Sequence, residues 1–343
     1  MRIFVNKTLH NAADALISDF YDLLPPGMNI DESGVVSRLG LDALLGEVVA
    51  ITKRSGSAIF TFFLLLILVG VLMSLSSLVG DKIGRAAEGG VATVASFVIF
   101  MSLYPVLAEA TEATVELNGF FTALVPVLLS YLTLGGGVAT AGTASFGLQA
   151  TIWVMGLILE LVSGIAVAFL AISAMSSLGE NAITRIAKGI KGAFGRAMGI
   201  LTATLTGTMA LQTYITSATD SATMRMARFA AGDMIPVVGG AVSGALSTLG
   251  GGLAYVGGII GGGSVVSILA IMLSPLILLL LYKMCLSVAT AFLEFTGRGG
   301  GVSCFSGFSS ALDAVISVYT MTTVVYILEI IILIMGGEMI FGS

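Results

Sequence analysis

Residues 229–263 read FAAGDMIPVVGGAVSGALSTLGGGLAYVGGIIGGG, and this stretch decides which kind of fold the chain can adopt. Glycine is its commonest residue, and Asp233 is its single charged residue. A linker rich in glycine and serine stays flexible in water because it has no apolar side chains to bury. This stretch carries valine, leucine and isoleucine throughout, yet its glycines make it a weak helix former in water. We therefore expect it to lie inside an apolar environment.

The composition of the whole chain identifies that environment as a membrane. Hydrophobic residues make up 57% of the 343 residues and charged residues 10%, and the mean hydropathy is +1.05. Globular proteins carry about a quarter charged residues, and a helix that spans a bilayer needs roughly 20 apolar residues. We expect an all-α polytopic membrane protein, a helical bundle with about 6 to 8 apolar segments. The charge-free runs that support this are 55–80, 89–108, 117–159, 197–219 and 234–282.

The remaining composition argues against several classes of function. The net charge is −5 and there is no basic block, so we expect no nucleic-acid partner. Cys285 and Cys304 form no CxxC pair, and the single histidine, His10, lies outside the apolar runs. These residues predict no disulfide framework, no multi-histidine metal site and no Ser-His-Asp centre. We expect the chain to be no enzyme and to hold no cofactor or metal, with membrane lipid around it.

The chain divides into two regions. Residues 1–54 are polar and carry apolar residues at helical spacing, which predicts an amphipathic N-terminal region on the membrane surface or on a partner. The first residues show no secretory signal pattern, so we expect no cleaved leader. Residues 55–343 form the transmembrane bundle. Within it, the basic amphipathic stretch 181–196 is expected on the cytoplasmic membrane surface, with a binding surface for a cytoplasmic partner as the alternative.

An internal repeat is predicted from a string that occurs twice. TLGGG stands at 133–137 and again at 248–252, and a proline within an apolar triplet precedes each copy, Pro126 in the first and Pro236 in the second. The apolar runs around the two copies fall at similar offsets. We interpret the pattern as two structural repeats. Repeat 1 covers about 81–177, repeat 2 covers about 190–289, and a terminal span follows at 311–336.

Each repeat is expected to contain a broken helix or a re-entrant hairpin. Proline removes a backbone donor and glycine tolerates a sharp turn, and lipid accepts such a break only where protein or a cavity shelters the freed backbone. The alternative is a closely packed helix pair, because Gly240/Gly244 and Gly257/Gly261 have the spacing that lets helices approach. The candidate structural or pore residues at the two breaks are Pro126, Gly135, Gly136, Gly137, Pro236, Gly250, Gly251 and Gly252.

Charged residues in or between the apolar runs need protein or water around them. Glu160, Lys283 and Glu329 lie within such runs, where Lys or Asp costs about 2.5–3.5 kcal/mol at a helix centre. We expect Lys283 either to pair with Glu160 or Glu329 or to reach toward the membrane surface. The acidic stretch 109–116 is expected to form a loop on the side opposite the basic stretches.

A resemblance to a known family centres on residues 220–239. The residues that carry it there are Asp220, Arg225, Ala227, Phe229, Gly232, Pro236 and Gly239. Further matches are the 121–128 stretch, the Tyr282-Lys283 pair, and the glycines 299–301 followed by Cys304. Over roughly 57–336 the chain resembles stage III sporulation protein AE, a family of multipass membrane proteins of endospore-forming bacteria. On this resemblance we add Arg225, Phe229, Gly232 and Gly239 to the candidate structural residues.

The resemblance implies a role in sporulation. It implies a subunit of the complex that joins mother cell and forespore, located in the mother-cell membrane around the forespore. The chain would form a homo-oligomer as a candidate channel, beside a cytoplasmic secretion-type ATPase and ring-forming subunits. Family members usually carry a cleaved leader, and the family brings no catalytic residues.

Two other functions remain open from the residues alone. The first is a secondary transporter with paired re-entrant hairpins and a midplane site near Pro126 and Pro236. The second is a structural membrane anchor that recruits partners through residues 1–54 and 181–196.

Overall fold

The computed structural model describes residues 2–24, 41–76, 81–175, 182–234, 239–295 and 299–341. Apart from short turns, all of this part of the chain is helical, which confirms the all-α prediction. The helices it contains are α1 (Arg2–Tyr21), α2 (Leu41–Ser76), α3 (Asp81–Leu134), α4 (Val138–Met175), α5 (Ala182–Met234), α6 (Gly239–Phe295) and α7 (Gly299–Phe341).

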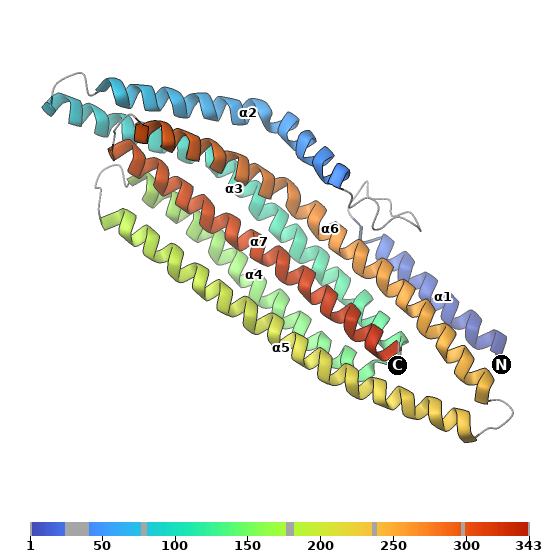
Figure 1. Cartoon of the computed structure of the whole chain (residues 1–343). Helices are drawn as coiled ribbons and strands as arrows, with labels where there is room; N and C mark the ends of the chain where they lie inside the picture. Colours follow the sequence, from blue (N-terminus) through green and yellow to red (C-terminus); the bar gives the residue numbers. More distant parts are fainter. Residues whose placement is uncertain are drawn as a thin grey trace.

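The long helices lie side by side in an elongated bundle. Helix α7 runs between α6 and α4, while α2 and α5 lie at opposite edges and α1 flanks one end of α6 (Figure 1). Both termini lie at the same end of the bundle. Helix α7 packs against α3, α4, α5 and α6. It lies among these four helices, so its buried face forms a large part of the interior of the bundle.

Five helices among the described residues are long and apolar enough to cross a membrane. They are α2, α3, α4, α6 and α7, with apolar spans at Val48–Leu75, Gly89–Leu134, Val138–Ile158, Leu253–Phe295 and Phe305–Ile340. The stretch 197–219, expected as a further crossing, lies in α5, which is not in this group within the residues described. Threonines and Gln212 dilute its apolar residues, so its hydropathy is lower than that of its neighbours.

Helix α3 corrects one prediction about topology. It runs unbroken for 54 residues with Pro105 and Pro126 inside it, so the stretch 109–116 is helical and forms no loop. At 1.5 Å per residue, a helix of this length extends about 80 Å, whereas the hydrocarbon layer is only about 30 Å thick. Proline removes a single backbone hydrogen bond, and the flanking turns and packed neighbours keep the helix continuous.

The first TLGGG string ends a helix. The amide of Gly137 donates to the carbonyl of Leu132 at 2.9 Å, and the amide of Gly136 donates to the carbonyl of Thr133 at 3.0 Å. Gly136 has a φ of 87°, a conformation that costs other residues a steric penalty. This pair of bonds is the Schellman motif, which satisfies the last carbonyls of α3 and allows the chain to turn into α4.

The second TLGGG string does not interrupt its helix. Residues 248–252, including Gly250, Gly251 and Gly252, lie inside the continuous helix α6. The break expected there is not observed, while Pro236 and its neighbours at 235–238 lie outside the described residues. In an apolar medium, the backbone hydrogen bonds of an unbroken helix stabilise this segment by more than the low helix propensity of its glycines destabilises it. In the described ranges the fold is an all-helical bundle with long apolar helices, and those ranges show neither a re-entrant hairpin nor an internal repeat.

Close helix packing explains other glycines of α6 and α7. The ring of Tyr131 on α3 occupies the space that a side chain on Gly257 or Gly337 would need, and a Cβ on Gly337 would lie 2.7 Å from Tyr131 Cε1. A Cβ on Gly261 would lie 2.9 Å from Ile334 Cγ1 of α7. These contacts match the packed-helix alternative for the Gly257/Gly261 pair.

We expect Gly257→Ala to lower the free energy of unfolding by about 1–3 kcal/mol, because the added methyl group must displace the Tyr131 ring. Gly258→Ala is the matched control, since no atom lies within 4 Å of its hypothetical Cβ. Unfolding of the purified protein by SDS in mixed micelles measures both values. Tyr131→Phe in the Gly257→Ala background removes the closest atom and should recover part of the loss. Equal losses for the two alanine variants would contradict this account.

Candidate functional site

Polar side chains are buried along the face of α7 that looks into the bundle. Tyr326 donates a hydrogen bond to Asn118 Oδ1 of α3 at 2.7 Å, and Tyr319 lies 3.2 Å from the hydroxyl of Thr111, also on α3. The hydroxyl of Thr151 on α4 donates to Oε1 of Glu329. We call these six residues the polar interior: Thr111, Asn118, Thr151, Tyr319, Tyr326 and Glu329.

The sequence of α7 places these groups on one face. Tyr319, Thr322, Tyr326 and Glu329 are three or four residues apart, which is the spacing of neighbours on one side of a helix. All four are buried. The ring of Tyr326 also packs on Phe121 of α3 with ring centroids 4.3 Å apart. Aromatic packing on α3 and hydrogen bonds to α3 and α4 together fix the rotation of α7.

Glu329 has only one of its two carboxylate oxygens satisfied. Its side chain is fully buried at 0% exposure. Its Oε1 accepts the bond from Thr151, whereas its Oε2 has no hydrogen-bond partner among the residues that the structure describes. The buried hydroxyls of Thr322 and Ser217 are also without partners there. Such atoms are rare in proteins and require an explanation such as an ion or an ordered water.

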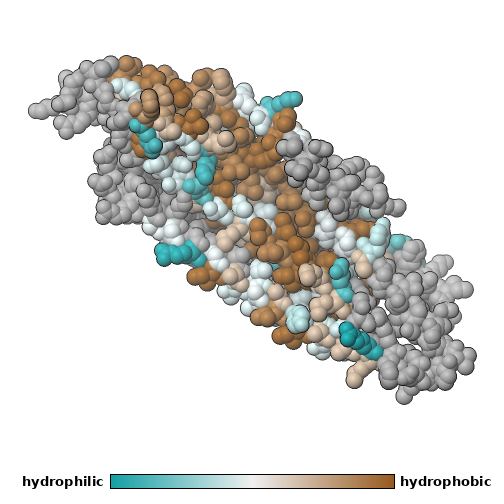
Figure 2. All heavy atoms as spheres, viewed as in Figure 1, coloured by the Kyte–Doolittle hydropathy of each residue, from teal (hydrophilic) through white to brown (hydrophobic). Residues whose placement is uncertain are grey.

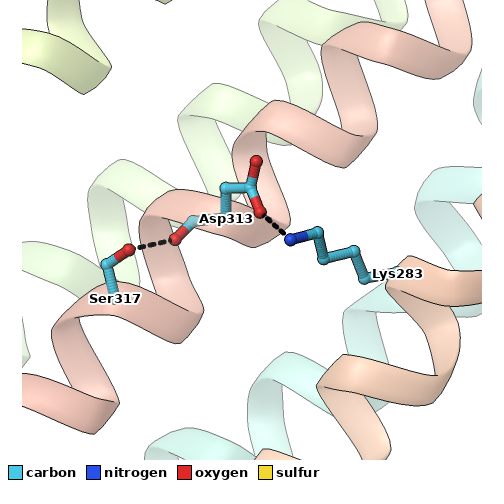
Figure 3. A network of polar contacts seen from close by, with 3 residues as sticks. All are labelled: Lys283, Asp313 and Ser317. Carbon is cyan, nitrogen blue, oxygen red and sulfur yellow. Dashed lines mark hydrogen bonds and ion pairs between the residues drawn. The ribbon is translucent and has the colours of Figure 1, made fainter. Parts of the chain in front are cut away.

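Lys283 has a different partner from those expected. Figure 3 shows its ammonium group reaching from α6 to the carboxylate of Asp313 on α7. Glu160 is exposed on α4, and Glu329 bonds to Thr151, so the two expected pairings are wrong. The register between α6 and α7, which the sequence does not contain, brings Lys283 and Asp313 together. About a third of each side chain is exposed, at 34% and 30%.

Tyr282, the residue before Lys283 in the sequence, lines a cleft on the side of α6 that faces α2. The cleft has a volume of about 360 Å³ and opens among α2, α3 and α6. Hydroxyl groups of Ser57, Thr61, Ser102 and Tyr282 line it, together with three apolar side chains. The hydroxyls of Thr61 and Ser102 donate to carbonyls of their own helices, at 2.7 Å and 2.9 Å. Two of its four hydroxyl groups are therefore already bonded to their own helices, and neither Lys283 nor Asp313 is part of its lining.

A row of carboxylates faces outward from the middle of α3. Glu109, Glu112 and Glu116 are all exposed, and their spacing of three and four residues puts them on one side of the helix. We call them the α3 acidic stripe. Exposed apolar side chains flank it, including Tyr104 and Val115. Figure 2 shows a band of hydrophobic residues across the coloured part of the visible face, with strongly hydrophilic residues in separate patches.

Asp220 is the first residue of the 220–239 stretch on which the family resemblance centres, and it contacts Thr140. Asp220 of α5 accepts hydrogen bonds from both the backbone amide and the hydroxyl of Thr140, at 2.8 Å and 2.7 Å. Thr140 lies in the first turn of α4, where backbone amides have no partner within the helix. A carboxylate at this end also interacts favourably with the helix dipole. Asp220 therefore caps α4 and ties it to α5.

The other candidate residues of the glycine and proline set are distributed along the helices. Pro126 and Gly136 are exposed, while Gly135 and Gly137 are buried. Arg225 is exposed on α5, Phe229 and Gly232 lie in the last turns of α5, and Gly239 is the first residue of α6. The structure therefore gathers the first glycine triplet and the Asp220 cap at the α3–α4 turn. It does not bring the second triplet to a matching turn.

Sequence reasoning missed most of the polar interior. It singled out Glu329 but none of the five residues that surround it: Thr111, Asn118, Thr151, Tyr319 and Tyr326. The available signal was the helical spacing of polar residues within the apolar α7 segment. Among the described residues, no group of three or more His, Cys, Asp or Glu side chains gathers as a metal site.

These features define a multipass α-helical membrane protein with a polar interior. Residues 29–337 match the family described as Stage III sporulation protein AE, and the chain belongs to this family. Stage III sporulation protein AE of Bacillus subtilis strain 168 is 24% identical over 305 residues, which cover 87% of this chain and 76% of that protein. No solved structure matches the chain. The resemblance inferred from the sequence is confirmed.

We expect Asp220→Ala to lower the free energy of unfolding by about 1–3 kcal/mol, because two donors of Thr140 lose their charged acceptor. Asp220→Asn keeps one acceptor oxygen and should lose less. Glu338→Ala, which removes an exposed carboxylate of α7, is the control and should change stability little. SDS unfolding in mixed micelles measures all three. An Asp220→Ala variant as stable as the control would remove the capping role.

We expect Lys283→Met and Asp313→Leu to show an interaction energy of about 1 kcal/mol or more in a double-mutant cycle. Each single variant leaves a charge in an apolar span, and the double variant leaves none. Partial exposure of both groups keeps the expected value well below that of a fully buried pair. Lys53→Met, which removes an exposed lysine of α2, replaces Lys283→Met in the control cycle. Interaction energies that are the same in the two cycles would contradict a specific pair.

Proposed function

We propose that the chain is a membrane-embedded subunit of a channel or secretion-like complex that links mother cell and forespore and is needed for forespore development. Two observations support this proposal. The chain belongs to the Stage III sporulation protein AE family, and its bundle places the α3 acidic stripe on its outer surface. Family membership supports the sporulation role. The α3 acidic stripe supports an assembly of several subunits with water next to α3.

The α3 acidic stripe is the observation that carries the channel role. Its residues lie within the apolar span Gly89–Leu134. An acidic side chain at the centre of a span costs about 2.5–3.5 kcal/mol when lipid surrounds it. Wherever this part of α3 lies within the hydrocarbon layer, three exposed carboxylates on one side of the helix require water or protein next to them. Further copies of the chain, arranged so that their stripes line an aqueous interior, meet this requirement.

The proposal includes the partners and the place of action. The chain multimerises in the mother-cell membrane around the forespore, next to a cytoplasmic ATPase and ring-forming subunits of the same complex. It contributes no catalytic step of its own in this proposal. Its part is to provide a rigid bundle, in which Tyr131 locks α3 against the glycines of α6 and α7.

A secondary transporter is the second candidate, and the polar interior favours it. A fully buried carboxylate with an unpartnered oxygen is typical of the sites at which transporters bind coupling ions. The two candidates differ in what the purified chain does alone. A channel subunit forms ring-like oligomers in detergent, whereas a transporter catalyses saturable uptake of a defined solute without partners.

We expect cysteines at positions 109, 112 and 116 to react with a membrane-impermeant maleimide in sporulating cells, because the stripe lines an aqueous path. The variants Glu109→Cys, Glu112→Cys and Glu116→Cys are made with Cys285 and Cys304 replaced by serine. Val94→Cys and Phe97→Cys, which replace exposed apolar residues of the same helix, are the lipid-facing controls and should be protected. Labelling is read by a mass shift of the chain on gels.

The outcome separates the two candidates. Protection of all three stripe positions, with reaction only after detergent is added, would contradict an aqueous path along α3. Reaction at all three positions together with monomeric protein in detergent would contradict a multimeric channel and leave a monomeric transporter.

A further inference from the structure

Glu329 lies in an interior that supplies it with almost no hydrogen bonding. Its carboxylate receives one bond, from Thr151 of α4. The second oxygen is buried and receives none from the described residues. On the same face of α7, seven residues before Glu329, the hydroxyl of Thr322 is likewise buried without a partner. Seven residues after it, a Cβ on Gly336 would lie 2.9 Å from the unpartnered hydroxyl of Ser217 on α5.

No basic group of the described residues balances a charge on Glu329. On α7, Tyr326 lies three residues from Glu329 and donates to Asn118, and Glu338 is exposed. On α3, Tyr131 packs against Gly337, and Glu116 is exposed. On α5, Arg196, Tyr214 and Arg225 are exposed, and Asp220 bonds to Thr140. On α4 Glu160 is exposed, and on α6 Lys283 pairs with Asp313. An ionised carboxylate here would be a buried charge without a countercharge.

The groups around Glu329 fit a proton better than a metal ion. Calcium takes six to eight oxygen ligands, and sites for hard cations combine several carboxylates and carbonyls. The hydrogen-bond partner that the described residues give this carboxylate is the hydroxyl of Thr151, which already directs its proton to Oε1, while Oε2 has no partner. A proton needs a single oxygen and removes the uncompensated charge at once. A water molecule beside Oε2 would then accept its hydrogen bond.

We propose that Glu329 is a proton-binding site inside the membrane bundle, at the contact between α4 and α7. In the protonated state the carboxyl is neutral, and α4 and α7 stay packed through the bond from Thr151. Loss of the proton places a charge between the helices, which favours entry of water along the face that holds Thr322 and Ser217. This site does not depend on the channel role, because it follows from the interior of one chain.

Infrared spectroscopy of the full chain in lipid vesicles tests the proposal, because a protonated carboxyl has a carbonyl stretch distinct from that of a carboxylate. We expect this band at neutral pH in the wild type and in the matched control Glu338→Gln. It should be absent in Glu329→Gln, which keeps an acceptor for Thr151 and should remain folded. The band should fall by about tenfold per pH unit above its midpoint as the pH is raised.

A second variant keeps the test decisive if Glu329→Gln fails to fold. Thr151→Val removes the donor that stabilises the ionised form, so the midpoint at which the band disappears should move to higher pH. Absence of the band at neutral pH in folded wild-type protein would overturn the proposal. Loss of the band when sodium replaces choline at constant pH would assign the site to a metal cation and would also overturn it. A band unchanged by Glu329→Gln would place the proton on another residue.

Discussion

A backbone amide or carbonyl in hydrocarbon has no water to bond to, and this constraint controls the structure. It explains why helices continue through Pro105, Pro126 and the glycines 250–252, where a chain in water would tend to turn. It also explains why α3 ends where replacement hydrogen bonds for its last turn exist. At Gly136 and Gly137 the chain satisfies carbonyls of α3 by the Schellman bonds, and Asp220 of α5 satisfies the Thr140 amide in the first turn of α4. The turn between α3 and α4 thus depends on a residue 80 positions away in the sequence.

The same medium removes the hydrophobic effect as a force between helices, so packing must hold the bundle together. Tyr131 fills the space left by Gly257 and Gly337, and Tyr326 packs on Phe121 while bonding to Asn118. These contacts centre on α7, which touches α3, α4, α5 and α6. Small residues and aromatic residues are complementary here, since a ring can enter the bundle only where the opposite helix lacks a side chain. A rigid central helix follows from this arrangement.

A charged side chain in an apolar span costs free energy, and the charged residues of this bundle meet that cost in three different ways. Lys283 and Asp313 neutralise each other across α6 and α7. The carboxylate of Glu329 is buried with one donor and no countercharge among the described residues, and the proton proposed there would remove its charge. The α3 acidic stripe stays exposed on the single chain, which requires water or further protein. The first solution is complete within the chain, whereas the other two depend on something bound to it, and for this reason they are the strongest indications of function.

The sequence by itself determined the solvent, the helical class and the family. Composition and the charge-free runs are enough for these conclusions, because the need for paired backbone groups in lipid leaves helices as the only solution for such runs. The sequence did not determine where the helices end or which charges meet. The two copies of TLGGG are identical, yet one ends α3 and the other lies inside α6. Only tertiary structure decides between these outcomes, because the bonds that stabilise the end of α3 and the start of α4 include a carboxylate from α5. The partner of Lys283 likewise depends on the register of α6 against α7, which is set by packing between residues far apart in the chain.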